Sequence, residues 1–198
     1  MKIDIAQFKH RNMSKLVKGA VVPRPIAWVS SISGEGVRNL APFSFFTVAS
    51  MDPITLCFSV GGAEKEKDTL ANIKASQAFV VNIVSEKLAN QMYETSKSYP
   101  AETDEFAIAG LDAEPGERVK VPRVKLAPVQ MECQLDRIVE VGNSSLVLGR
   151  LVCYHINDEI YEEVDKVNPD KLSVIGRMAG DYAFTREFFE LTDKKFHK

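Results

Sequence analysis

Apolar and polar positions alternate most regularly in the last third of the chain. From residue 130 to residue 136 every second residue is polar or charged, as it is along a strand with one face in water. A turn at residues 142 to 145 follows, and residues 146 to 156 return with a high content of Val and Leu. We therefore expect a long β-hairpin over residues 129–156.

Shorter apolar runs in the first half of the chain predict further strands. Residues 20–32 are rich in Val, Ile and Trp, the turn sequence 33–36 follows, and residues 37–48 return. Pro42 removes a backbone donor in the middle of the returning run, so this segment should be irregular or at a sheet edge near that point. Residues 54–60 and 79–84 have the composition of two more strands.

The remaining segments predict short helices and loops. Residues 1–18 have loose helical spacing, and we expect helices over 69–76, after the polar pair Asp68 and Thr69, and over 86–98, before Tyr99 and Pro100. Residues 101–126 mix charges with Gly and Pro and predict a long loop, 171–175 predict a strand, and 186–191 predict a helical end. This pattern favours a single domain over residues 1–198, mainly β with added helices, built as a small barrel.

Composition excludes several classes of protein. Twenty-five basic residues stand against twenty-seven acidic ones, so no strong positive field is present that would bind nucleic acid. Apolar runs such as 79–81 are far too short to cross a bilayer, and the first residues lack a signal-peptide pattern, so we expect a cytoplasmic protein with no membrane partner.

Cysteine and histidine spacing predicts no metal site. Cys57, Cys133 and Cys153 form no C-x-x-C motif, and an odd count argues against a disulfide framework, so we expect buried apolar roles for them. His155 has no second ligand at metal spacing in the sequence, and His10 and His197 lie near the ends.

Two polar clusters have the chemistry needed to hold a phosphorylated flat ring. Ser30, Ser31 and Ser33 place hydroxyls near a strand end, and Lys67 precedes a predicted helix whose free amides favour an anion. Asn39 offers a donor and an acceptor for a ring edge, beside a run that supplies backbone amides and apolar contact: Ala41, Pro42, Phe43 and Ser44. The alternative interpretation is that the serines belong to a turn and Lys67 to a solvated charge run.

Several motifs in this order resemble the flavin reductase-like family of FMN-binding split-barrel proteins. The motifs are residues 24–31, 36–46, 67–73, 79–82, 122–123, 132–133 and 176–182. The resemblance covers nearly the whole chain and implies a homodimer of six-stranded Greek-key barrels, with FMN near the subunit interface and NADH or NADPH as a transient reductant.

The same resemblance implies roles for individual residues. It implies that Ser30, Ser31, Lys67 and Thr69 bind the phosphate. Asp68 belongs to the same motif but is better suited to cap the helix. Ser59 is expected near the ring or the ribityl chain, and Arg177 and Tyr182 near the flavin of the partner subunit.

No other catalytic motif is readable in the chain. A P-loop, a G-x-G-x-x-G turn after a strand and a Ser/His/Asp set are all absent from the sequence, so no side chain is expected to be catalytic and the flavin carries the chemistry. We therefore expect an NAD(P)H-dependent flavin reductase that serves free flavin or another acceptor. A flavoredoxin-like electron carrier, a non-catalytic flavin-binding barrel and a generic interaction module are the alternatives.

Overall fold

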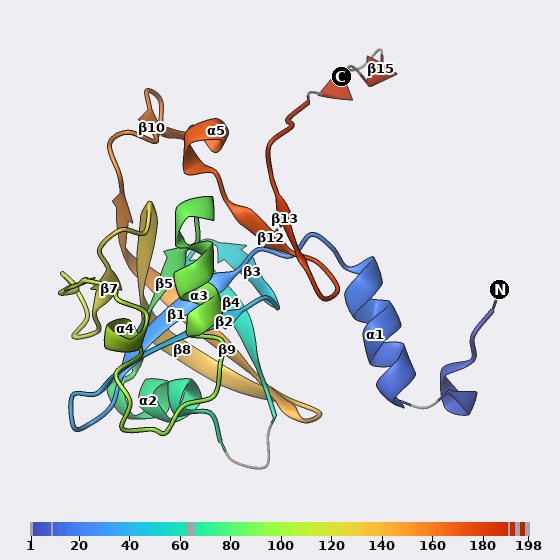
Figure 1. Cartoon of the computed structure of the whole chain (residues 1–198), viewed down its shortest axis with the longest axis horizontal. Coiled ribbons are helices and arrows are strands. Elements are labelled where there is room, and N and C mark those ends of the chain that lie inside the picture. Colours follow the sequence, from blue (N-terminus) through green and yellow to red (C-terminus); the bar gives the residue numbers. More distant parts are fainter. Residues whose placement is uncertain (1, 9, 63–65, 190, 193–194, 197–198) are drawn as a thin grey trace.

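The protein is mainly β with a few helices, as expected. The computed structural model describes residues 2–8, 10–62, 66–189, 191–192 and 195–196. Its main element is a seven-stranded antiparallel sheet in the order β2-β1-β5-β8-β9-β4-β3 (Figure 1). The strands are β1 (Ala27–Ile32), β2 (Arg38–Phe43), β3 (Phe46–Met51), β4 (Ile54–Gly61), β5 (Ala78–Ile83), β8 (Val129–Val141) and β9 (Ser144–Ile156).

The sheet curls because its two edge strands are consecutive in the chain. β2 and β3 lie at opposite ends of the strand order and are separated only by Ser44 and Phe45. The amide of Ser59 in β4 donates to the carbonyl of Phe45 at 2.9 Å, which fixes this connection against the sheet. A sheet whose first and last strands are joined by two residues must close on itself, so the strands form a barrel.

The barrel interior is a dense apolar core. Val29, Phe58 and Phe79 are fully buried there, and Leu70 and Ile73 of helix α2 (Asp68–Ser76) pack against the same cluster. Gly149 in β9 permits this packing, since a Cβ at that position would lie 2.3 Å from Cζ of Phe79. One face of α2 is therefore fixed by the core, and this fixes the start of the helix as well.

The outer face of β1 and β2 is also buried, beneath short helices. Trp28 and Leu40 belong to a second apolar cluster with Met92 of α3 (Ala89–Glu94) and Phe106 of α4 (Glu105–Ile108). The indole Nε1 of Trp28 donates to Oγ1 of Thr95 at 2.9 Å, so its buried polar group is satisfied. β1 is thus enclosed on both faces, and its neighbour β2 is held at a defined edge of the barrel.

The other elements are short. The remaining helices are η1 (Ile5–Gln7), α1 (His10–Ala20), η2 (Glu86–Leu88) and α5 (Pro169–Leu172). The remaining strands form two-stranded pairs: β6 (Ala113–Glu114) with β7 (Arg123–Val124), β10 (Tyr161–Glu162) with β11 (Lys166–Val167), β12 (Ile175–Arg177) with β13 (Tyr182–Phe184), and β14 (Leu191–Thr192) with β15 (Lys195–Phe196). Across the described part of the chain, no helix combines the length and apolar character that crossing a membrane requires.

Most predicted elements are confirmed at or near their expected bounds. The hairpin over 129–156, the strand over 54–60, the strand over 79–84, the helix over 69–76 and the helical start of the chain are all present. The return segment over 37–48 is two strands rather than one, divided at Ser44, and Pro42 does lie on an edge strand. The helix over 86–98 is shorter than predicted, and the loop over 101–126 contains α4 and the β6–β7 pair.

Three element predictions are wrong. Residues 20–26 are not a strand, because α1 continues to Ala20 and two prolines, which lack the amide donor of a sheet, follow at 23 and 25. Of residues 171–175, only Ile175 belongs to a strand, as the first residue of β12. The Asn168 side chain accepts from the amide of Lys171 and starts the helical turn α5, which continues to Leu172. Residues 186–189 are not helical; their side chains are exposed and offer no buried face that could hold an amphipathic helix, and residue 190 lies outside the described residues.

Candidate functional site

A cavity of about 220 Å³ lies between the edge strand β2 and the start of helix α2. It brings together most of the residues predicted from the two polar clusters of the sequence: Asn39, Ala41, Pro42, Phe43, Lys67, Asp68 and Thr69. Its other walls are the segment 95–99, which follows α3, and Glu105 at the start of α4. Two motifs almost thirty residues apart in the chain therefore share one cavity.

The first turn of α2 presents backbone amides to this cavity. Lys67 is the N-cap residue and makes no side-chain capping bond, while the amides of Leu70 and Ala71 donate to its carbonyl. Among the described residues nothing accepts from the amides of Asp68 and Thr69. Free amides at a helix start, together with the helix dipole, attract an anion such as a phosphate.

The expected capping role of Asp68 is wrong. The helix begins one residue earlier than predicted, so Asp68 is its first helical residue and Lys67 takes the cap position. A carboxylate in the first turn still interacts favourably with the helix dipole. It also competes with any anion bound at the same turn, so the side chain of Asp68 is a wall of the cavity, and only the backbone amide of this residue can donate to a ligand.

Lys67 is the cation of this cavity that is free to meet an anion. Its side chain is exposed and makes no ion pair with a described residue. The other lysine of the lining, Lys97, is already paired, with 2.6 Å between its Nζ and Oε2 of Glu94. An incoming phosphate would therefore find one uncommitted ammonium group beside two uncommitted amides.

Asn39 is the centre of a hydrogen-bond network beneath the cavity. Its Oδ1 accepts from Oγ of Ser31 at 3.0 Å and from Oγ1 of Thr69 at 2.7 Å, and its Nδ2 donates to Oε2 of Glu105 at 2.7 Å. Asn72 donates in turn to Oγ of Ser31 at 3.2 Å. The two hydroxyls use both acceptor positions of Asn39 Oδ1. Because one Nδ2 hydrogen is bonded to Glu105, the second Nδ2 hydrogen is the group that the side chain can still offer to a ligand.

The backbone of β2 offers fewer amides than the sequence suggested. The amide of Leu40 points away from β1 and donates to Oε2 of Glu105 at 2.5 Å. Residues along an antiparallel strand alternate in direction, so the amides of Ala41 and Phe43 face β1, and Pro42 has no amide to present at the outer edge. The wall made by these residues is consequently apolar, which suits the face of a flat ring.

Glu105 is the buried acid of the site. Its side chain is 7 % exposed and belongs to α4, which packs on β2. Burial raises the pKa of Glu105 to about 7, against the lowering effect of the hydrogen bond from Leu40. The charges of Asp68 and Asp104 raise this pKa further, and the charge of Lys67 lowers it. Asp104 itself is paired with Arg38, whose Nε lies 2.7 Å from its Oδ2.

Several predicted site residues lie outside this cavity. Ser30 is fully buried on the opposite face of β1 from Ser31, where its Oγ donates to the carbonyl of Pro122 at 2.6 Å. Ser31 supports Asn39 from behind, as described above. Ser44 also lies outside, and its Oγ accepts from Arg24 Nε at 3.4 Å. Ser59 lies in β4. Arg177 and Tyr182 lie in the β12–β13 hairpin, with 4.5 Å between the guanidinium carbon and the ring centre.

A larger cavity of about 640 Å³ lies at the other end of α2. Its walls are formed by residues 32–34, 75–78 and 118–120 together with Gln134 and Val152, and its charged groups are Arg118 and Lys120. Volume alone would favour this space as a ligand site. Of the residues considered for the phosphate, only Ser33 lines it, and none of those that the family resemblance implies does, so the smaller cavity is the candidate site.

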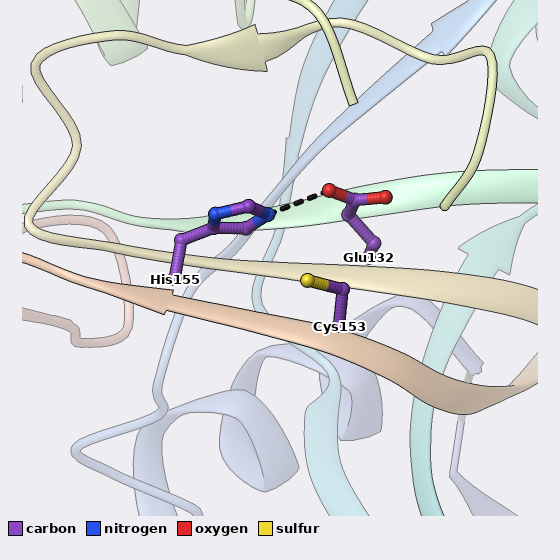
Figure 2. Close-up of side chains that lie close together, drawn as sticks. All are labelled: Glu132, Cys153 and His155. Atoms are coloured by element: carbon purple, nitrogen blue, oxygen red, sulfur yellow. Dashed lines mark hydrogen bonds and ion pairs between the residues drawn. The ribbon is translucent and has the colours of Figure 1, made fainter. Parts of the chain in front are cut away.

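A second polar cluster lies on the β8–β9 hairpin (Figure 2). Ligand atoms of Glu132, Cys153 and His155 lie within 4.8 Å of one another, although these residues match no metal-binding motif in the sequence. The cross-strand register places Glu132 opposite Cys153, and His155 follows two residues later on the same face. This juxtaposition had a detectable signal, because strand alternation fixes which residues share a face.

The Glu132 carboxylate is already saturated by hydrogen bonds. It accepts from the amides of Glu117, Arg118 and Val119 at 2.8, 2.7 and 3.0 Å, and from Nε2 of His155 at 2.6 Å. Arg123 Nε lies 4.0 Å from Oε1 of Glu132, and its positive charge would repel a metal cation at this position. The cluster therefore holds the 117–119 loop against the barrel rather than forming an open metal centre.

Two parts of the candidate site were missed by sequence reasoning. Glu105 meets residues 39 and 40 across a sequence separation that no local pattern reveals. The segment 95–99, at the end of the helix predicted over 86–98, contains four hydroxyl residues and a lysine, and this polar composition was a usable signal.

The chain is similar to a known protein family and to several solved structures. Residues 19–173 match the family model described as a flavin reductase like domain. Nitrilotriacetate monooxygenase component B from Bacillus cereus superposes with a TM-score of 0.93 at 33 % identity, over 96 % of this chain and 98 % of that one. The 2-nitrobenzoate 2-nitroreductase of Pseudomonas fluorescens gives 0.90 at 32 % identity, over 100 % and 98 %.

A more distant structure shows the fold. A split barrel domain protein of the flavin reductase type from Shewanella frigidimarina has a TM-score of 0.85 at 16 % identity, over 97 % of this chain and 98 % of that one. The barrel described above is thus the split barrel expected from the sequence.

Proposed function

The chain belongs to the flavin reductase like family, and from this premise we propose that it is an oxidoreductase that binds FMN in the cavity between β2 and α2. In this proposal it takes reducing equivalents from NADH or NADPH and passes them to free flavin or another acceptor. The observation that carries the proposal is the meeting of the Asn39–Phe43 motif with the Lys67–Thr69 motif in one cavity.

The residues of the cavity fit the two ends of this cofactor. The free amides of Asp68 and Thr69 and the uncommitted ammonium of Lys67 suit a phosphate, and the wall of Ala41, Pro42 and Phe43 suits an apolar ring face. The cavity of about 220 Å³ lies below the range of roughly 300–1,000 Å³ that is typical of ligand pockets. It would therefore enclose one part of an FMN molecule, and the rest would extend beyond it.

The protein's own residues bind and orient in this mechanism. FMN, when bound, supplies the acceptance and release of a hydride or of electrons. Lys67 and the two α2 amides hold the phosphate, the β2 wall limits where the ring can lie, and the remaining Nδ2 hydrogen of Asn39 is a donor beside it. No side chain of the described cavity needs to act as a nucleophile.

Anaerobic reduction tests the proposed activity. We expect the purified protein mixed with FMN to retain yellow absorbance after gel filtration and to lose it on addition of NADH or NADPH without oxygen. A protein that retains flavin but is bleached by neither nicotinamide would exclude the reductase and leave the electron carrier. A protein that retains no flavin would contradict the cofactor assignment itself.

We further propose that the protein is a homodimer and that the second copy completes the site. Helix α1 extends away from the barrel (Figure 1), and Leu16, Val17 and Val21 at its end are about half exposed or more. An isolated helix of eleven residues is marginal in water, so this one needs a surface to pack on. Exposed Val48 and Met51 on the edge strand β3 are a further apolar surface for the same partner.

Sedimentation measurements test the dimer. We expect a dimer at micromolar concentration, and we expect the double change Val17→Glu and Val21→Glu to shift it toward monomer and to weaken FMN binding as well. Val164→Glu is the matched control, because Val164 is exposed at the β10–β11 turn, away from α1 in Figure 1. A wild-type protein that sediments as a monomer at these concentrations would contradict the proposal.

A further inference from the structure

Glu105 is a buried carboxylate that faces the candidate flavin cavity without a cation of its own. Both of its hydrogen bonds, from the amide of Leu40 and from Nδ2 of Asn39, end on the same oxygen, Oε2. Among the described residues, Oε1 accepts no hydrogen bond and no basic side chain forms an ion pair with it. A carboxylate held in this way gains two neutral donors, and the charge of Lys67 lowers its pKa without forming an ion pair with it.

The charges around Glu105 come from four parts of the fold and largely cancel. Within the cavity region Asp104 of the α4 cap is paired with Arg38 of β2, and Lys97 after α3 is paired with Glu94, which also accepts from Tyr99. At the start of α2, Asp68 raises the pKa of Glu105 and Lys67 lowers it, so their charges act on Glu105 in opposite directions. Glu105 is therefore the unbalanced negative charge of the cavity among the described residues.

We propose that Glu105 couples binding of the flavin phosphate to the uptake of one proton. This coupling rests on the proposed function, since it assigns the phosphate to the start of α2. Asn39 links the two positions directly: its Nδ2 contacts Glu105 and its Oδ1 contacts Thr69 in the first turn of α2. Two anions separated by one side chain in a largely buried site repel each other strongly.

Protonation of Glu105 relieves that repulsion without breaking the network. A proton from solvent forms an O–H bond on the carboxyl group, and no bond of the flavin changes. A neutral carboxyl keeps its carbonyl oxygen as the acceptor for the amide of Leu40 and for Asn39. The empty site is poised for this step, because burial holds the pKa of Glu105 at about 7.

The consequence is a pH-dependent affinity. A group that is neutral in the complex and ionised in the free protein weakens binding as the pH rises through its free pKa. With that pKa at about 7, FMN affinity should fall about fivefold between pH 7 and pH 8. Riboflavin lacks the phosphate, so its affinity should change little over the same interval.

Calorimetry in two buffers with different ionisation enthalpies measures the proton directly. At pH 8 we expect wild-type protein to take up more than half a proton per FMN bound and almost none per riboflavin bound. Glu105→Gln should bind FMN with no net uptake and with an affinity that is flat between pH 7 and pH 8. Its amide oxygen can accept both hydrogen bonds, so the variant should keep its fold, which circular dichroism checks.

The outcomes separate this coupling from the proposed function. Equal proton uptake by wild-type protein and Glu105→Gln would overturn the role of Glu105. If the variant does not fold, equal uptake with FMN and riboflavin in the wild-type protein overturns it instead. A wild-type protein that binds no flavin at all would overturn the proposed function and the coupling with it.

Discussion

Replacing Glu132 by alanine is expected to lower the free energy of unfolding by about 3–5 kcal/mol, the usual cost of breaking a buried charged network. Glu132 is fully buried and accepts three backbone amides of the 117–119 loop in addition to His155. Removing the carboxylate leaves these donors unsatisfied away from water. Chemical denaturation at a fixed protein concentration measures the loss as a shift of the unfolding midpoint.

Matched variants separate this network from a general effect of losing a glutamate. Glu140 also lies on β8 but is exposed and accepts only from Ser145, so Glu140→Ala should cost less than about 1 kcal/mol. Glu132→Gln should be nearly as damaging as the alanine change, because an amide nitrogen would face backbone amides that need an acceptor. A loss below 1 kcal/mol for Glu132→Ala would contradict the structural role of the cluster.

The same carboxylate makes stability depend on acid. Burial by itself would raise the pKa of Glu132, but the hydrogen bonds from Glu117, Arg118, His155 and Val119 together hold it below the ordinary value. A group whose pKa is lowered by folding stabilises the protein above its unfolded pKa, about 4.3 for glutamate, and loses this effect as the pH falls through the folded pKa. The deficit of Glu132→Ala should therefore be full at pH 7 and shrink below about pH 4.

Lys67→Ala is expected to weaken FMN binding about ten- to a hundredfold. A hydrogen bond to a charged group contributes about 1.5–3 kcal/mol, and about 1.4 kcal/mol corresponds to a factor of ten in affinity. Lys67 is exposed and makes no ion pair with a described residue, so its removal should leave the fold intact and act on the ligand. Fluorescence titration of FMN against wild-type and variant protein gives the ratio of dissociation constants.

Lys120→Ala is the matched control for this variant. Lys120 is an exposed lysine that lines the larger cavity at the other end of α2, so its removal should change FMN affinity less than twofold, within the scatter of ordinary surface substitutions. If Lys120→Ala weakens FMN and Lys67→Ala does not, the phosphate belongs in the larger cavity. The two lysines thus discriminate between the two ends of the same helix.

The sequence predicted best those features that are encoded locally. The pattern of residues 129–156 predicted the β8–β9 hairpin. The polar pair at 68 and 69 predicted the start of α2, which lies one residue earlier than expected. Residues 168 and 169 also contained a local signal, an Asn cap followed by Pro at the first helical position, which indicates the α5 turn rather than a strand.

The faces of β1 were predictable from the period of a strand. Val29 and Ser31 share the barrel side, while Trp28 and Ser30 share the opposite side beneath the helices. Two consecutive serines therefore cannot both contact one phosphate from this strand, and the alternation rule alone would have separated them. Ser30 instead joins the buried network with Asn82 and the carbonyl of Pro122.

The partners of Asn39 could not be read from the sequence. Glu105 lies in a segment that was predicted as a loop. Its contact with β2 depends on the packing of its neighbour Phe106 within the second apolar cluster. Such contacts arise from tertiary packing between elements far apart in the chain. Sequence motifs therefore located the two ends of the cavity, and the fold supplied the acid that connects them.

The structure of a crystal grown with FMN tests the central claim most directly, that these two motifs form one flavin site. The account predicts phosphate density within hydrogen-bond distance of the amides of Asp68 and Thr69, with the ring against residues 41–43. Phosphate density beside Arg118 and Lys120 in the larger cavity, or a cavity at β2 closed by the protein's own side chains, would contradict it.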